Sequence, residues 1–403
     1  MPSSEITTVT TTAGARTLLC SLQDQGSSTH SIETLRIEIN IPASVREGIQ
    51  EIYENDTHEG GQDSGARTQG AFDHYATELF RDQEELADLI GELSIAREDV
   101  EIRHLEHIIP DFHLPIHALR GIQDAPQLES LSIQYKLTNT RPAPMLSASY
   151  IASQVSSFTS SLLAVLCTLP NLKRIRLSLP HTYQPPYSPF LDTLVDSALA
   201  DPKILPTIET VDLTHTAPRY NTILRILRAH HSTLKHLILD QGIEFYMPAG
   251  ERVENSDSSD SDDDSVEVGE LEPGSDDRLY FTWAGVGRAI SALRKERGPS
   301  NYPLKSLCVA KSEVNMKENA LFPTPVGRKE VLEMLQSGKS SEGADSDIDL
   351  GELVVCSAWP GEKEEHVEGC GHSTGWTEQF KPKSDLWQAK TWTWLDQAEP
   401  RVL

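Results

Sequence analysis

Residues 169–180 read LPNLKRIRLSLP, and their apolar side chains follow a mixed spacing. Leu172 and Ile175 are three residues apart, whereas Ile175, Leu177 and Leu179 follow at steps of two. A helix repeats near 3.6 residues, and a half-buried strand repeats strictly at two. The stretch therefore predicts a short strand that turns Ile175 and Leu177 to one face, preceded by a turn that holds Leu172.

The same spacing, apolar-x-x-apolar-x-apolar, occurs in six places. The copies read IETLRI, LESLSI, LKRIRL, IETVDL, LKHLIL and LKSLCV, and they begin at residues 32, 128, 172, 208, 234 and 304. Their starts are 96, 44, 36, 26 and 70 residues apart, and only 26 lies in the range of about 20–29 residues usual for leucine-rich repeats. Apolar stripes at helical spacing predict helices between the copies, at 158–170, 219–231 and 279–296, and a longer one at 72–99. Segment 102–121 has the outline of a further, degenerate copy.

Short parallel strands joined by helical returns predict an α/β fold. We expect an irregular leucine-rich-repeat-like solenoid over residues 15–320, preceded by a disordered N-terminus, 1–14. A flexible linker is predicted at 336–352. Residues 353–403 hold five of the six tryptophans and are predicted to form a Trp-rich C-terminal cap or extension, because a solenoid needs a cover over its last open end.

Composition excludes several classes of function. The chain has 35 basic and 61 acidic residues, a net charge of −26, which argues against direct nucleic-acid binding. Five scattered cysteines argue against a disulfide framework and favour a reducing compartment, cytoplasmic or nuclear. No secretory signal is visible at the N-terminus, and the longest apolar run, 162–169, is too short to span a membrane.

An acidic segment lies between the last two copies. Residues 254–277 hold eleven acids and no base, so the surrounding stretch, 251–278, is predicted to be a disordered insertion. Ser259 and Ser261 each precede an acid by three residues and are candidate phosphorylation sites. The segment is interpreted either as a solvated spacer or as bait for a basic partner, including an internal mask for a basic patch of the chain itself.

The strand residues between the inward apolar positions are predicted to face the other side of the sheet. Aligned across the copies, one such row reads Arg36, Ser132, Arg176, Asp212, Ile238 and Cys308. Arg174 and Arg176 would lie together there, as two guanidiniums suited to carboxylates or phosphate, and the acidic insertion would be their internal mask. The predicted partner-binding residues on this concave face are Arg36, Gln134, Arg174, Arg176, Asp212, His236 and Asp240. Solvated strand charges without a ligand are the alternative interpretation.

No pattern in the chain predicts catalysis. Cys356, His366, Cys370 and His372 are ligand types for zinc, but their spacing matches no common zinc finger. We therefore interpret them as unliganded cysteines and surface histidines. The glycines of 283–290 lack the spacing and the lysine of a phosphate-binding loop. No cofactor and no enzymatic activity are predicted.

The six motif copies, their irregular spacing, the polar loops and the acidic insertion resemble the repeat part of fungal F-box/leucine-rich-repeat proteins over about residues 15–320. The resemblance implies a substrate-recognition subunit of a ubiquitin ligase that works with Skp1 and cullin, although no F-box is apparent in this chain. We expect a protein partner on the concave face, with no direct nucleic-acid and no membrane contact. The alternative is an acidic nuclear protein that binds basic partners such as histones.

Overall fold

The computed structural model describes the chain in separate stretches: 6–24, 34–38, 85, 88, 102–109, 118–135, 148–178, 198–213, 220–240, 283–298, 302–310, 332–333, 335–336 and 348–358. The elements follow in the order β1 (Ile6–Val9), α1 (Thr12–Asp24), β2 (Thr34–Glu38), β3 (His104–Ile109), η1 (Ala118–Asp124), β4 (Ser130–Tyr135), α4 (Ala148–Leu166), β5 (Arg174–Ser178), β6 (Thr210–Asp212), α6 (Tyr220–Ala229), β7 (His236–Asp240), α7 (Trp283–Arg297), β8 (Ser306–Ala310) and β9 (Val354–Ala358). The acidic insertion, most of the predicted linker and residues 359–403 lie outside these stretches.

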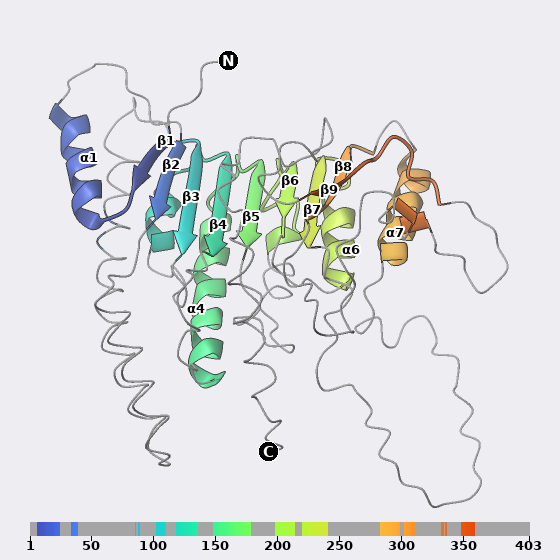
Figure 1. The fold of residues 1–403 in the computed structure, drawn as a ribbon, viewed down its shortest axis with the longest axis horizontal. Helices are drawn as coiled ribbons and strands as arrows, with labels where there is room; N and C mark the ends of the chain where they lie inside the picture. Colours follow the sequence, from blue (N-terminus) through green and yellow to red (C-terminus); the bar gives the residue numbers. More distant parts are fainter. Residues whose placement is uncertain are drawn as a thin grey trace, which may run out of the picture.

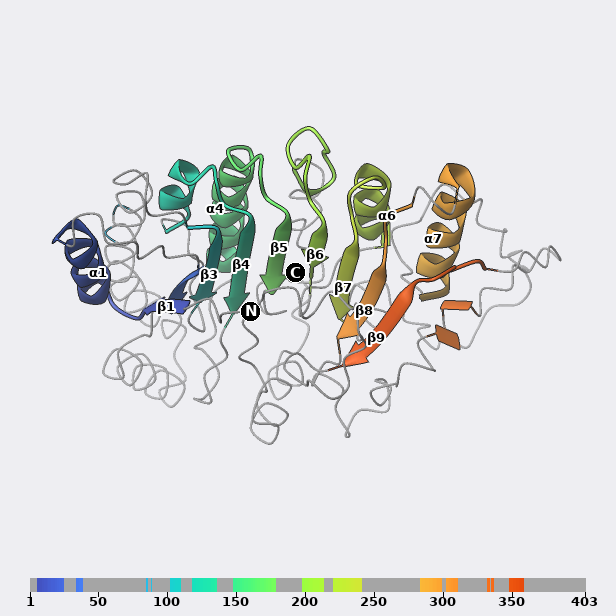
Figure 2. The same ribbon diagram turned by 90° about the horizontal axis from the view of Figure 1, so that it is seen from above.

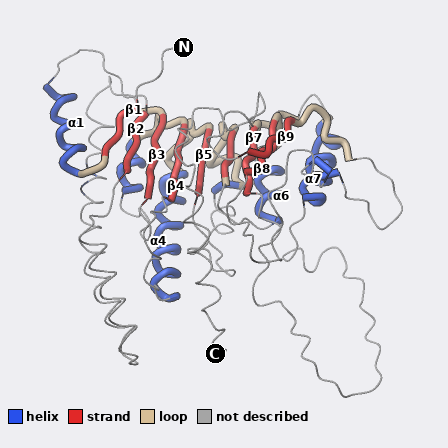
Figure 3. Tube along the Cα trace, viewed as in Figure 1, coloured by secondary structure: helices blue, strands red, loops and turns tan. Residues whose placement is uncertain are grey.

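The described strands form one open sheet. Nine strands pair in the order of the sequence, β1 to β9, and all eight pairings are parallel (Figure 1). Helices α4, α6 and α7 lie on one side of the strand row (Figure 2), and α1 lies beyond its β1 end (Figure 3). The predicted α/β architecture of parallel strands in a solenoid-like row is therefore confirmed at this coarse level.

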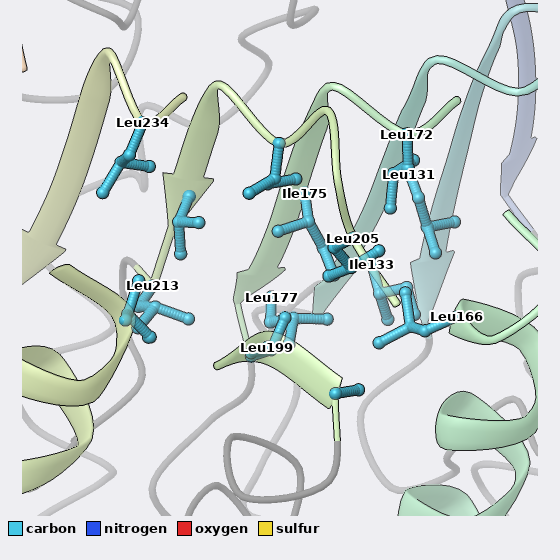
Figure 4. Packing of buried hydrophobic residues seen from close by; sticks show 14 of the residues in the cluster. Leu131, Ile133, Leu166, Leu172, Ile175, Leu177, Leu199, Leu205, Leu213 and Leu234 are labelled. Carbon is cyan, nitrogen blue, oxygen red and sulfur yellow. The ribbon is translucent and has the colours of Figure 1, made fainter. Parts of the chain in front are cut away.

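The register places equivalent motif residues side by side. Leu131 pairs with Ile175, Ile175 with Val211, and Val211 with Leu237, so the second motif position forms one row of side chains across the sheet. The third position forms a parallel row that includes Ile133, Leu177 and Leu239. The first position lies just before each strand and is buried below it: Leu128, Leu172, Ile208, Leu234 and Leu304. These rows make the core (Figure 4).

The helices cover this core through the predicted apolar stripes. Helix α4 contributes Phe158, Leu162, Val165 and Leu166, and all four are fully buried. Helix α6 buries Ile223, Ile226 and Leu227, and α7 buries Val286, Ile290 and Leu293. Helix α4 begins at Ala148, ten residues before the predicted start. Residues 148–157 are compatible with a helix but carry no regular apolar stripe, so periodicity did not predict this part of the helix. Of the helix predicted at 72–99, only Glu85 and Asp88 are described, both helical, and Glu85 is paired with Arg16.

Two ends of the sheet differ from the prediction. Residues 6–14 were expected to be disordered, but 6–9 form β1, which pairs with β2 from Ile6 and Thr34 to Val9 and Ile37. Main-chain hydrogen bonds and the burial of Val9 hold this strand, and neither leaves a motif in the sequence. At the other end, residues 354–358 of the predicted cap region extend the sheet as β9.

Strand β9 is joined to the sheet by a tight turn at the end of the predicted linker. Leu350 is buried, and Gly351 has φ of 57°, a left-handed conformation that favours glycine. The Arg294 guanidinium of α7 occupies the space that a Cβ at Gly351 would need. Asp349 lies 3.9 Å from Arg294 in a partly exposed ion pair, so this turn is held against α7.

Main-chain hydrogen bonds repeat from strand to strand at the residue preceding each strand. The carbonyl of Lys173 accepts from the amides of Glu209 and Thr210, at 2.7 and 3.0 Å. The carbonyls of Arg103, Glu129, Glu209 and Lys235 each accept two successive amides of the next strand in the same way. We call these residues, with Lys305, the pre-strand row. Its regularity shows that β3 to β8 begin in the same backbone conformation. Among the described helices, none combines the length and apolarity needed to cross a membrane.

Candidate binding surface

The strand residues that alternate with the core rows face away from α4, α6 and α7, and we call this side the opposite face. By backbone register, three rows of residues cross it. The first row is Ile6, Thr34, His104, Ser130, Arg174, Thr210, His236, Ser306 and Val354. The second is Thr8, Arg36, Glu106, Ser132, Arg176, Asp212, Ile238, Cys308 and Cys356. The third contains Glu38, Ile108, Gln134 and Ser178 on one side, and Asp240, Ala310 and Ala358 on the other.

Two buried ion pairs lie in the second row. Arg36 donates from Nε and Nη2 to Oε2 of Glu106, at 3.0 and 2.8 Å, and both side chains are 4% exposed. Arg176 donates from Nε to Oδ2 of Asp212 at 2.6 Å, with the two side chains 7% and 1% exposed. Ser132 lies between the two pairs and is fully buried. These four charges are therefore matched within the sheet.

The second row becomes apolar toward β9. Ile238, Cys308 and Cys356 form a buried cluster of their own, separate from the main core. Cys356 belongs to the residue set weighed as a zinc site, but His366, Cys370 and His372 lie outside the described residues. Within the described part of the chain, no three His, Cys, Asp or Glu side chains are grouped so as to hold a metal ion.

The first row keeps part of its surface accessible. His104, Arg174 and His236 are half-buried, whereas the hydroxyl residues between them, Ser130 and Thr210, are buried. Arg174 Nη2 is 3.2 Å from Nδ1 of His104, and because arginine only donates, Nδ1 is the acceptor. His236 Nδ1 and Ser306 Oγ are 2.8 Å apart. The row therefore presents hydrogen-bonding groups and one permanent positive charge.

The pre-strand row borders the first row and alternates in charge from Arg103 to Lys235, after which Lys305 is a second basic residue. Lys173 Nζ is 2.9 Å from Glu129, and Lys235 Nζ is 2.6 Å from Glu209. The hydrogen bond from Lys173 holds the pKa of the Glu129 carboxyl below its ordinary value; burial opposes this, and the charges of Lys173, Arg103 and His104 support it. Arg103 and Lys305 are exposed.

Five cations come together along these two neighbouring rows: Arg103, Lys173, Arg174, Lys235 and Lys305. We call them the cationic edge. The described residues of the two rows between β3 and β8 contain only two acids, Glu129 and Glu209, so the edge carries a net +3 before any histidine is counted. The whole chain carries −26. Counted over the described residues alone, these two rows are therefore basic in a chain that is acidic as a whole.

The structure places the predicted partner-binding residues on the opposite face in three different settings. Arg174 and His236 are half-buried in the first row, whereas Arg36, Arg176 and Asp212 are buried in the second. Gln134 and Asp240 occupy the third row by backbone register. The expectation that Arg174 and Arg176 project as an exposed pair is wrong for Arg176, because the in-register Asp212 binds it. Ser259 and Ser261 lie outside the described residues.

The prediction missed three residues in and next to β3 that contribute to this surface: Arg103, which precedes the strand, and His104 and Glu106 within it. Their strand is the degenerate copy in segment 102–121, where Ile102 and Leu105 keep the spacing and His107 replaces the third apolar residue. A motif search that accepted residues other than aliphatic ones, such as His107, at the third position would have found this strand. Comparison of the chain with known protein families and with curated proteins finds no match.

Proposed function

We propose that the chain is a non-enzymatic protein-binding scaffold whose ligand lies along the cationic edge and the first row. The observation that carries the proposal is the in-register sheet, which sets equivalent polar side chains in continuous lines. From β3 to β8 these lines extend about 24 Å, the length of roughly seven residues of extended peptide. A long and charged line suits a polypeptide, whereas small molecules bind in enclosed, mostly apolar pockets.

The finer form of the proposal is an irregular leucine-rich-repeat protein that recognises substrates for a ubiquitin ligase. Its support is the six motif copies and their resemblance to the repeat part of F-box proteins. In this form the opposite face binds the substrate, and Skp1 and cullin join through a further element. The scaffold proposal does not depend on this finer assignment.

Quantitative affinity capture with matched variants tests the scaffold proposal. Arg174→Glu/Lys305→Glu reverses two charges of the cationic edge, and Arg288→Glu/Lys295→Glu reverses two exposed charges of α7 on the helical side. We expect a defined set of proteins to be retained by the native chain and the α7 variant, and to fall by about tenfold or more with the edge variant, since each opposed charge weakens a polar contact. Circular dichroism confirms that both variants fold.

The same affinity-capture experiment also tests the ubiquitin-ligase form of the proposal. Skp1 and cullin among the retained proteins support the ubiquitin-ligase assignment. An identical set of retained proteins from all three folded chains would contradict the proposal that the edge binds a partner.

A second candidate function rests on the insertion. Its eleven acids without a base favour contact with a basic protein such as a histone, in the manner of an acidic nuclear binding protein. Replacing all eleven acids of 254–277 by their amides would then abolish histone retention, whereas Arg174→Glu/Lys305→Glu would leave it intact. The two variants thus assign any captured protein to the edge or to the insertion.

A further inference from the structure

We propose that Cys308 and Cys356 form a reversible redox site, where hydrogen peroxide oxidises the two thiols to a disulfide that fixes β9 to β8. The two residues are direct register partners in the parallel pair of these strands. Both are fully buried thiols, and with Ile238 they form a cluster separate from the main core. Figure 2 shows β8 and β9 side by side at one end of the sheet. The inference goes beyond the proposed function and does not depend on it.

The register brings the two thiols within bonding reach. Neighbouring strands lie about 4.7–4.9 Å apart, and disulfides join residues whose Cα atoms are about 4.4–6.8 Å apart. Register partners in a parallel pair turn their side chains to the same face, so Cys308 and Cys356 meet on the opposite face beside Ile238. The other two described cysteines, Cys20 and Cys167, are exposed and belong to no strand. Within the described part of the chain, this is therefore the pair that the sheet itself aligns.

A disulfide at this place would be strained and therefore easy to reduce. Because the two Cα–Cβ bonds point the same way, the Cβ atoms lie about one strand spacing apart, whereas a disulfide places them about 3.5–4.5 Å apart. The strands must draw together to close the bond. Strained disulfides have the higher reduction potentials that are found in labile, regulatory pairs. The site thus stays as two thiols in a reducing compartment and closes when the concentration of peroxide rises.

The oxidation takes place in two steps that balance. The Cys356 thiolate attacks one oxygen of hydrogen peroxide, the O–O bond breaks, the sulfur becomes a sulfenic acid and the second oxygen leaves as water. The Cys308 thiolate then attacks that sulfur, the S–S bond forms and the sulfenic oxygen leaves as a second water. The two sulfurs lose two electrons, the peroxide gains them, and the two thiol protons end on the waters. Two molecules of a small thiol such as glutathione reverse the reaction through a mixed disulfide and are themselves oxidised to a disulfide.

Cys356 reacts first because of its place in the sheet. Among the described strands, β9 pairs with β8 alone, whereas β8 lies between β7 and β9. A strand with one neighbour opens locally at a lower cost in free energy than a strand with two. Hydrogen peroxide is also small enough to enter openings that exclude iodoacetamide. The disulfide then suppresses this opening, since it ties β9 to a strand that β7 holds from the other side.

Thiol mapping of the full-length folded chain tests the proposal. The chain is exposed to hydrogen peroxide, its remaining thiols are blocked in denaturant, and unreduced peptides are identified by mass spectrometry. We expect a linked Cys308–Cys356 peptide pair in most chains, and its loss when reduced glutathione is added before blocking. Both cysteines should remain thiols in a chain kept under reducing conditions throughout.

Two matched variants test the order of reaction. Cys308→Ala should leave a sulfenic acid at Cys356, which dimedone labels. Cys356→Ala should leave Cys308 at least about fivefold less labelled, because β8 is paired on both sides and opens less often. Circular dichroism confirms that both variants fold.

Hydrogen exchange tests the effect on the strand. The amides of β9 should exchange at least about fivefold more slowly in the oxidised chain, because the disulfide opposes local opening, and the amides of α6 should exchange at an unchanged rate. Cys356→Ala treated with the same peroxide controls for oxidation elsewhere and should show no slowing.

Survival of Cys308 and Cys356 as thiols after Cys20 and Cys167 are fully oxidised would overturn the proposal. So would a disulfide from Cys356 to another cysteine, such as Cys370, or a bond that forms only in denaturant. A Cys308–Cys356 bond that glutathione does not reduce, or that leaves the exchange of β9 unaltered, would also refute a reversible site. None of these outcomes involves a partner, so the result stands apart from the capture experiment on the proposed function.

Discussion

His107 occupies a core position that the neighbouring strands give to aliphatic side chains. Its register partners are Ile37 and Ile133, it is 2% exposed, and its Nδ1 has no hydrogen-bond partner among the residues that the structure describes. Burial lowers its pKa from 6.5 to about 4. His230 is also buried and its pKa is also lowered by burial, but its Nε2 is bonded to the Leu199 carbonyl at 2.7 Å, which opposes the shift. Nδ1 of His230 also has no partner among the described residues, so the two histidines differ by the one hydrogen bond at Nε2.

Stability should depend on pH through His107. Above pH 6.5 the imidazole is neutral in the folded and the unfolded chain, and it adds no pH dependence. As the pH falls from 6.5 toward 4, the unfolded chain takes up a proton that the folded chain refuses, so folding is progressively disfavoured, by about 3 kcal/mol in total. His107→Leu removes this effect. We expect its stability advantage over the native chain to be about 2 kcal/mol larger at pH 5 than at pH 7.5, measured by urea unfolding. An equal advantage at both pH values would contradict this account.

The ion pair of Arg176 and Asp212 predicts a non-additive pair of substitutions. Asp212→Ala removes the buried carboxylate that accepts the hydrogen bond from Arg176 Nε. It should lower the free energy of unfolding by about 3–5 kcal/mol. Arg176→Met/Asp212→Leu replaces both charges by apolar groups of similar size and should recover most of that loss. Unfolding free energies of the single and double variants test this. A double variant as unstable as the sum of its single variants would mean that the two side chains are not coupled.

At the scale of the element, the motif predicted strands where all three of its positions are aliphatic. Strands β1, β3 and β9 were harder to predict from the sequence. A single substituted motif position removes the apolar pattern, whereas the main-chain pairing of the strand persists. In β9 the corresponding positions are Glu352, Val355 and Ser357, and only Val355 keeps the spacing. The buried ion pairs were beyond prediction, since Arg36 and Glu106 are 70 residues apart and meet only through the register of β2 and β3.

The cysteines report on whether β9 belongs to the sheet. Cys308 and Cys356 are paired in register and fully buried, whereas Cys20 and Cys167 are exposed. We expect iodoacetamide to alkylate Cys20 and Cys167 of the native chain readily. Cys308 and Cys356 should stay protected until the protein unfolds, because a buried thiol reacts only after opening. Peptide mass spectrometry resolves the sites individually. Alkylation of Cys356 as fast as Cys167 would show that β9 does not dock on β8.

At the scale of the whole molecule, the sheet and its helical cover supply stability. Among the described residues, the main core is built from residues of β1 to β9 and their helices. Residues 254–277 carry eleven acids and few apolar side chains, a composition that is not suited to a core. Deleting 254–277 should therefore change the unfolding free energy by less than about 1 kcal/mol, because exposed ion pairs contribute little. Thermal melts of the native and shortened chains at equal salt measure this. A large loss of folded protein would assign the segment a packing role.

The central claim is that the cationic edge binds polypeptide, and selection from a random peptide display library on the purified chain tests it most directly. Fixed cations on a line of parallel strands favour acidic peptides. We predict that selected peptides are enriched in Asp and Glu, that Arg288→Glu/Lys295→Glu gives the same enrichment, and that Arg174→Glu/Lys305→Glu abolishes it. Selection of no peptides, of basic or apolar peptides, or of the same acidic peptides by the edge variant would contradict the claim.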